Sequence, residues 1–166
     1  MTRKAIATLS FISLLFALSV CTAQAAPPVS TVKEIGRDGP FIAYDNGTVL
    51  DTRTNLMWAA RDNGGNITWY GAKSYCENYH EGGYTDWRMP RQDELDGLFY
   101  PAKTYKSDCG DDVVLTELIH LTCSVLWASE TSGLNGAAFR FRDGQRGWAP
   151  QSGLRSLRAL PVRPGK

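Results

Sequence analysis

The sequence is poor in the residues that carry most enzyme chemistry. It has only two histidines, His80 and His120, and neither lies at metal-ligand spacing from a cysteine or another histidine. No Ser, Cys or Thr lies in a glycine-flanked nucleophile elbow, and no phosphate-binding glycine loop is present. Neighbouring acids such as Asp93 and Glu94 would point apart on a helix. The sequence therefore predicts a protein with no catalytic residues, no metal and no cofactor. The alternative is a calcium site in the acidic loop of Asp108, Asp111 and Asp112, although these acids lack the spacing of a recognisable calcium site.

The sequence also lacks a long apolar run outside its first 25 residues. Arg3 and Lys4 precede the apolar segment 5–20, and Ala23-Gln24-Ala25 forms an A-x-A cleavage site. We predict a signal peptide over residues 1–25 and no transmembrane segment after its removal. The expected location is periplasmic, or extracellular and on the cell surface. A lipoprotein anchored at Cys21 is the alternative, although valine before that cysteine fits lipidation poorly.

Cysteines are few, and three of the four remain after cleavage. Disulfides persist outside the cytoplasm. Cys109 and Cys123 flank a compact segment, so we predict a disulfide between them, which would contribute about 3 kcal/mol in the chain-entropy model. Cys76 is then left over. We expect it to be a buried thiol on a helix, with a reactive or intermolecular role as the alternative.

The chain has no large excess of positive or negative charge, because its formal net charge is +1. Nucleic acid is therefore a poor fit as a partner. Residues 140–166, however, hold seven Lys and Arg against one Asp, and residues 26–139 are acidic. On a strand, Arg140 and Arg142 would share one face, opposite Phe139 and Phe141.

Arginine suits sulfate, carboxylate or phosphate. The candidate ligand-binding residues are Arg140, Arg142, Arg146, Trp148 and Arg158. The alternative is that these arginines form the solvated outer face of a sheet.

The order of elements predicts an α+β fold, with two helices segregated from a small, mainly antiparallel sheet with long loops. Asp45-Asn46-Gly47 is a hairpin turn, and Thr68 is a suitable N-cap for a helix that Gly82-Gly83 would stop. A second helix follows Pro90, over about 91–99, where Arg91 is a weak cap. Later strands are expected over 125–129, 137–142 and 156–162. We predict one domain over 41–163, preceded by a flexible lead-in over 26–40.

The segment from Gly82 to Pro90 reads Gly-Gly-Tyr-Thr-Asp-Trp-Arg-Met-Pro. We interpret it as a packed junction between the two helices. Trp87 is expected to be buried, and Asp86 and Arg88 are expected to tie the loop to neighbouring backbone.

Several motifs resemble the Lcl C-terminal domain family over nearly all of residues 41–163. They are Asp45 to Thr52, Thr54 to Trp58, Thr68-Trp69, Ala72 to Asn78, Gly82 to Pro90, Glu94-Leu95, Val125 to Glu130, Phe141 to Gly144 and Arg158 to Arg163. The resemblance implies a fold like that of C-type lectins and the formylglycine-generating enzyme. It also implies a secreted or surface recognition domain, since the family's namesake is a bacterial surface adhesin that binds sulfated glycans.

The motif residues are interpreted as fold residues, and the resemblance supplies no catalytic set. These residues are Trp58, Trp69, Gly83, Asp86, Trp87, Arg88, Pro90 and Trp127. Two features depart from the pattern. Leu157 occupies a position where family members often have a cysteine, so Cys76 would lack its usual partner. The Glu-Pro-Asn and Gln-Pro-Asp signatures of calcium-dependent sugar binding are also missing.

The leading hypothesis is an exported, non-catalytic recognition domain that binds an anionic polysaccharide, sulfated or acidic, or another envelope ligand. The first alternative is a structural or protein-interaction module of the cell envelope. The second is an enzyme related to the formylglycine-generating group.

Overall fold

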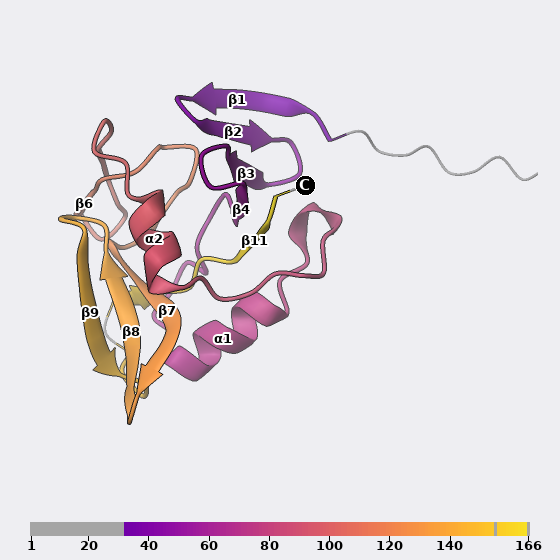
Figure 1. The fold of residues 1–166 in the computed structure, drawn as a ribbon. Coiled ribbons are helices and arrows are strands. Elements are labelled where there is room, and N and C mark those ends of the chain that lie inside the picture. Colours follow the sequence, from indigo (N-terminus) through magenta and orange to yellow (C-terminus); the bar gives the residue numbers. More distant parts are fainter. Residues whose placement is uncertain (1–31, 155, 166) are drawn as a thin grey trace, which may run out of the picture. The chain divides into compact units, whose positions relative to one another are not determined.

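The computed structural model describes residues 32–154 and 156–165, and the predicted signal peptide lies outside them. These residues form an α+β fold with two α-helices and mostly antiparallel sheets (Figure 1). No helix within the described residues is long and apolar enough to cross a membrane. The predicted fold class is confirmed at this level.

The first sheet has five strands in the order β1-β2-β3-β4-β11, all antiparallel. Its strands are β1 (Glu34–Asp38), β2 (Phe41–Tyr44), β3 (Thr48–Asp51), β4 (Leu56–Ala59) and β11 (Val162–Pro164). The predicted turn between β2 and β3 is present, and Gly47 has a φ of 78°, which glycine adopts at little cost.

The second sheet has four strands in the order β10-β7-β8-β9. Its strands are β7 (Val125–Ser132), β8 (Asn135–Arg140), β9 (Gln145–Pro150) and β10 (Leu157–Arg158), of which β10 pairs parallel to β7. A small third sheet joins β5 (Tyr105–Lys106) to β6 (Asp112–Val113). β9 forms one edge of the second sheet (Figure 1).

Two predicted boundaries are corrected. Residues 34–38 belong to the predicted lead-in but form β1, which pairs with β2 and so gains backbone hydrogen bonds. The single strand expected over 156–162 is instead two short strands in different sheets, β10 and β11. Pro161 lies between them and has no N–H to donate, which interrupts a continuous ladder.

Helix α1 (Trp69–Glu77) begins as predicted, because the Thr68 hydroxyl accepts a hydrogen bond from the Gly71 N–H at 3.1 Å. It ends earlier than expected. The Asn78 side-chain amide donates to the Ser74 carbonyl at 2.8 Å and closes the last turn. Gly82 therefore does not stop this helix. It lies instead in the short 3-10 helix η1 (Glu81–Gly83), with a positive φ.

Helix α2 (Gln92–Leu98) has a stronger start than Arg91 alone would give. The Glu94 carboxylate accepts a hydrogen bond from the Arg91 N–H at 2.8 Å, so the third helical residue caps the helix. Leu95 and Leu98 are fully buried. This helix packs against β7 and β8.

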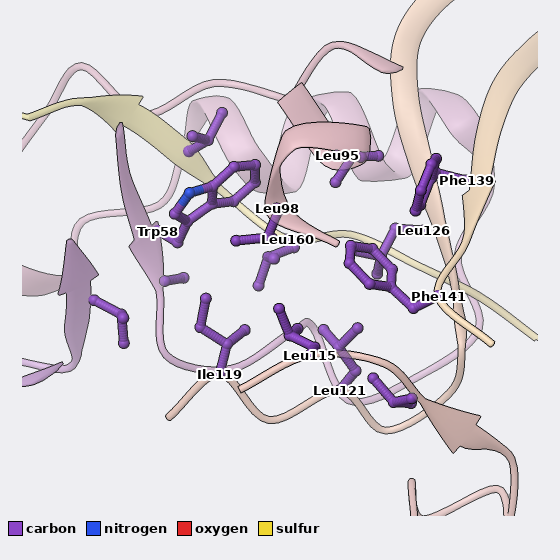
Figure 2. Close-up of a cluster of buried hydrophobic side chains, with 14 of the residues drawn as sticks. Trp58, Leu95, Leu98, Leu115, Ile119, Leu121, Leu126, Phe139, Phe141 and Leu160 are labelled. Atoms are coloured by element: carbon purple, nitrogen blue, oxygen red, sulfur yellow. The ribbon is translucent and has the colours of Figure 1, made fainter. Parts of the chain in front are cut away.

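A large hydrophobic cluster fills the space between α2 and both larger sheets. Figure 2 shows Trp58 of β4, Leu98 of α2 and Phe139 of β8 converging on it. The Phe139 and Phe141 rings meet edge to face at 5.0 Å, so both face the core as the strand pattern predicts. A second cluster contains Trp69 and Trp127.

The four motif tryptophans are buried, which confirms the prediction made for Trp87. Three of them donate their indole N–H to a backbone carbonyl: Trp69 to Ala128, Trp127 to Ile67 and Trp87 to Glu81. The Trp58 indole N–H has no partner among the described residues.

The junction from Gly82 to Pro90 is held by side chains as well as backbone. Arg88 and Val162 exchange two backbone hydrogen bonds of 2.9 and 3.0 Å. The Arg88 guanidinium, however, binds the Glu94 carboxylate at 2.6 and 2.8 Å, and Asp86 binds the Arg163 guanidinium at 2.6 and 3.0 Å. The expectation that the Arg88 side chain ties to backbone is confirmed, because its Nη1 also donates to the Met89 carbonyl at 3.3 Å. Both side chains in addition have an oppositely charged partner, which the sequence did not predict. Gly83 has a φ of 76°, and Pro90 is buried.

Candidate functional site

The best-formed candidate site lies on the β8–β9 hairpin. The hairpin turns at Asp143-Gly144, where Gly144 has a φ of 71° and its N–H bonds the Arg140 carbonyl at 2.9 Å. Arg140 then pairs with Gln145, and Ala138 pairs with Gly147. Directly paired residues share a sheet face, so these four lie on one face.

A pocket of about 310 Å³ opens on this hairpin. Small residues leave room for it: Ala138, Gly147 and Ala149 form part of its lining. Arg140 and Leu157 line it as well, and Trp148, with 52% of its surface exposed, borders it from the edge strand. A concave patch lined by an arginine and small residues is suited to holding a small polar ligand.

The predicted ligand-binding residues are only partly brought together. Arg140, Arg146 and Trp148 all border the pocket. Trp148 pairs with Ala137 in the sheet, so its side chain lies on the opposite face from that of Arg140. The same holds for the side chain of Arg146, which pairs with Phe139. There its guanidinium binds Asp96 of α2 at 2.7 Å.

Arg140 is also paired. Its Nε and Nη2 bind the two oxygens of Asp143 at 2.8 and 2.7 Å, and Nη2 also donates to Gln145 at 3.1 Å. The hydrogen bond with Asp143 raises the pKa of Arg140, and the same bond lowers the pKa of Asp143. Arg142 is exposed, and within residues 32–154 and 156–165 no ion pair joins it to a carboxylate. The positive charge of this face is therefore smaller than the sequence suggests.

Arg158 does not belong to this surface, which corrects the prediction. Only 6% of the residue is exposed. It lies on β10, and its guanidinium donates to Thr122 at 2.7 Å and to the sulfur of Cys123 at 2.9 Å. The strand break at Pro161 was missed at the sequence level, and the inward direction of Arg158 was missed with it.

The predicted Cys109–Cys123 disulfide is confirmed, with 5.2 Å between the Cα atoms. Cys76 is free and buried, also as predicted. Burial raises the pKa of its thiol well above the ordinary range, which disfavours a reactive thiolate.

Metal ligation finds no support in the geometry. Within the part of the chain that the structure describes, no group of three or more His, Cys, Asp or Glu side chains could hold a metal ion. The three clustered acids near β6 have separate partners: Asp111 accepts from Ser124 at 2.8 Å, Asp112 pairs with Lys106, and Asp108 pairs with His120.

Sequence reasoning missed a second concave region beside α1. Tyr75, Tyr79 and Glu81 line two adjacent pockets of about 530 and 250 Å³. Burial raises the pKa of both tyrosines, and a hydrogen bond with Glu81 raises that of Tyr79 further. Helical spacing predicts both rings on the buried face, but they lie at its margin and are half-buried. The signal in the sequence that indicates this region is the pair of tyrosines, Tyr75 and Tyr79, on one face of the helix.

Comparison with known families gives one result. The model of the Lcl C-terminal domain matches residues 47–163, which is most of the chain. The matched range begins after β2 and ends within β11. No curated protein matches the sequence.

Proposed function

Because the chain belongs to the Lcl C-terminal domain family, we propose that it is an exported, non-catalytic recognition domain with a C-type-lectin-like fold. The proposed ligand is an anionic saccharide, sulfated or acidic, held at the β8–β9 pocket. Two helices with mostly antiparallel sheets and a disulfide are compatible with such a domain outside the cytoplasm.

The observation that carries the proposal is the pocket of about 310 Å³ that Arg140 lines together with small residues of the hairpin. Arg140 uses Nε and Nη2 for its neighbours, so its Nη1 is the donor that an incoming sulfate or carboxylate would meet. Arg142, exposed on the adjoining turn, adds a second charge. A sugar ring would lie against Ala138 and Gly147, which line the pocket on the same face as Arg140.

The pairing of Arg140 with Asp143 sets the expected strength of binding. The carboxylate repels an anionic ligand and competes for the guanidinium, so affinity should be modest and sensitive to salt. A fixed guanidinium, in return, loses less side-chain entropy when it binds.

The test is retention on heparin and binding to a glycan array at two salt concentrations. The variant Arg140→Ala/Arg142→Ala should lose retention, and wild-type retention should fall at high salt. Arg37→Ala is the matched control, because Arg37 also pairs with an acid three residues away but lies on β1. Equal retention of the double variant and the wild type would refute the proposal.

A protein-interaction module is the second candidate, and the edge strand β9 favours it. Trp148 and Leu134 are large apolar residues with 52% and 85% of their surface exposed, and β9 has an unpaired edge within the described sheet. This function predicts association that persists in about 1 M salt, where the Debye length is only about 3 Å. Trp148→Ser would abolish it, with no signal on the glycan array.

An enzyme of the formylglycine-generating kind would need a reactive cysteine. Cys123 is joined to Cys109 and Cys76 is buried, which supports a non-catalytic assignment. Thiol-dependent turnover that Cys123→Ser abolishes would reverse that assignment.

A further inference from the structure

The two sulfurs of the disulfide have different surroundings. Cys109 is an exposed residue in the loop after β5, whereas Cys123 is fully buried beside β7. A backbone hydrogen bond from the Cys109 N–H to the Thr122 carbonyl, 2.9 Å long, holds the two chain segments together. An external reagent therefore meets the disulfide from the Cys109 side.

A buried cation lies against the other sulfur. Arg158 Nη2 is 2.9 Å from the Cys123 sulfur and 3.6 Å from that of Cys109. The remaining acceptors of this guanidinium are neutral: the Thr122 hydroxyl, the Asn66 side-chain carbonyl and the Leu157 backbone carbonyl. Among the described residues, no ion pair joins Arg158 to a carboxylate, and Asp62 reaches it only through Thr122.

This arrangement stabilises a thiolate better than it stabilises a disulfide. Arginine keeps its charge, and a buried charge without a counterion is unfavourable. A disulfide sulfur is only a weak acceptor, whereas a thiolate at the same place would supply the missing negative charge. A neighbouring cation lowers the pKa of a cysteine, and a thiol of lower pKa is a faster leaving group in disulfide exchange.

We propose that the Cys109–Cys123 disulfide is an exchange site for small thiols, with Cys109 as the modified residue and Cys123 as the leaving group. A thiolate attacks the Cys109 sulfur, and a new S–S bond forms between them. The bond between Cys109 and Cys123 breaks, and its electron pair goes to the Cys123 sulfur, where Arg158 holds the thiolate. This first step is an exchange with no net oxidation or reduction.

A second thiol completes the reduction. Its thiolate attacks the reagent's sulfur in the mixed disulfide and releases Cys109 as a thiolate. The reagent leaves as a symmetrical disulfide, so two electrons pass from two thiols to the protein. The site thus accepts any small thiol that reaches Cys109.

The experiment treats the full chain with reduced glutathione under native conditions, followed by peptide mapping with mass spectrometry. The expected adduct lies on Cys109, and adducts on Cys21 or Cys76 are scored separately. Tryptophan fluorescence follows the fold, and the exchange rate should not change in urea below the unfolding transition. An adduct on Cys123, or exchange that occurs only after unfolding, would overturn the proposal. The wild-type chain suffices for this test, without any variant.

The role of Arg158 is measured by rate. Arg158→Met should slow the exchange about tenfold, since an adjacent cation lowers a thiol pKa by about 1–3 units. Arg158→Lys keeps the charge and should retain most of the rate, and it replaces the methionine variant if that does not fold. Arg37→Met is the surface control. The proposal is contradicted if Arg158→Met exchanges as fast as wild type. It is also contradicted if Arg158→Lys is slowed about tenfold, as expected for loss of the charge.

Discussion

Arg158 and Arg163 come from the same closing segment, five positions apart, and are buried alike, with 6% and 5% of their surface exposed. Their surroundings differ. Arg163 binds both oxygens of Asp86 at 2.6 and 3.0 Å, and the Tyr84 ring lies over its guanidinium at 3.9 Å. Arg158 binds two neutral side chains, a backbone carbonyl and a disulfide.

The difference separates two uses of a buried guanidinium. Arg163 joins β11 to the Gly82–Pro90 junction, because its partner Asp86 belongs to that loop. Its charge is balanced within the folded state. The charge of Arg158 is not balanced by a direct carboxylate, so it gains most when a nearby group becomes negative. One arginine therefore stabilises the fold, and the other favours a chemical change next to it.

The largest expected effect comes from breaking the balanced pair. Asp86→Ala leaves the Arg163 charge buried beside the Tyr84 ring and the Met57 sulfur, neither of which is a counterion. We expect a loss of about 3 kcal/mol in the free energy of unfolding, at the low end for buried pairs because Asp86 is itself half-exposed. Urea denaturation measures it.

Thr85→Ala is the control for this variant, because Thr85 is an exposed neighbour in the same loop. Its loss should be within about 0.5 kcal/mol. If Asp86→Ala costs no more than Thr85→Ala, the ion pair does not hold the junction.

The Arg88–Glu94 pair sharpens the comparison, since here the carboxylate is the buried member. Burial alone would raise the pKa of Glu94, but hydrogen bonds from the Arg88 side chain and the Arg91 N–H outweigh it and lower the pKa below its ordinary value. The unfolded chain therefore takes up the proton first. The stability that Glu94 contributes is complete above its unfolded pKa, and it is lost as the pH falls through its lower folded pKa.

We expect Glu94→Gln to lose about 2 kcal/mol at neutral pH, because it weakens charged hydrogen bonds to Arg88 and the helix cap. The difference from wild type should shrink as the pH falls below about 4.5, the ordinary value for glutamate. Urea titrations across this range measure it. Glu77→Gln, in an exposed i,i+4 pair, should stay within about 0.5 kcal/mol. A difference that does not depend on pH would contradict the assignment.

Removing the unbalanced charge should have a smaller effect. Arg158→Met takes away hydrogen bonds to Thr122 and Asn66, but it also removes a buried cation that has no direct counterion. These terms oppose each other, so we expect a loss of about 1 kcal/mol. Arg163→Met, measured in the same way, should lose more. The reverse order would mean that Arg158 is the more important arginine for the fold.

The sequence predicts those features that depend on local pattern. The Asn46-Gly47 turn, the Thr68 cap, the burial of Phe139 and Phe141, and the disulfide all follow from residue type and spacing over short distances. The family and the α+β class are likewise predicted. The turn, the cap and the strand faces are each decided within one element or loop, and the disulfide joins cysteines only 14 residues apart.

The directions of the arginines are decided over longer distances. Pro161 divides the closing segment between two sheets, which turns Arg158 toward the disulfide and Arg163 toward Asp86. Asp96, which pairs with Arg146, comes from α2, 50 residues earlier. Counting charges along residues 140–166 therefore predicts a strongly basic face, whereas the fold distributes those charges between the core and paired positions.

The smallest effect on stability is expected at Arg140. Its ion pair with Asp143 is exposed to solvent, whereas the pair of Arg163 with Asp86 is partly buried. Both members of the surface pair are exposed, with 40% and 35% of the side-chain surface accessible, so solvent screens their attraction. Arg140→Ala should leave the urea midpoint unchanged within error while it reduces heparin retention. A lower midpoint would make Arg140 a fold residue like Arg163, and the loss of retention would then report damage to the hairpin. An unchanged midpoint, by contrast, makes any change in retention evidence for contact between Arg140 and the ligand.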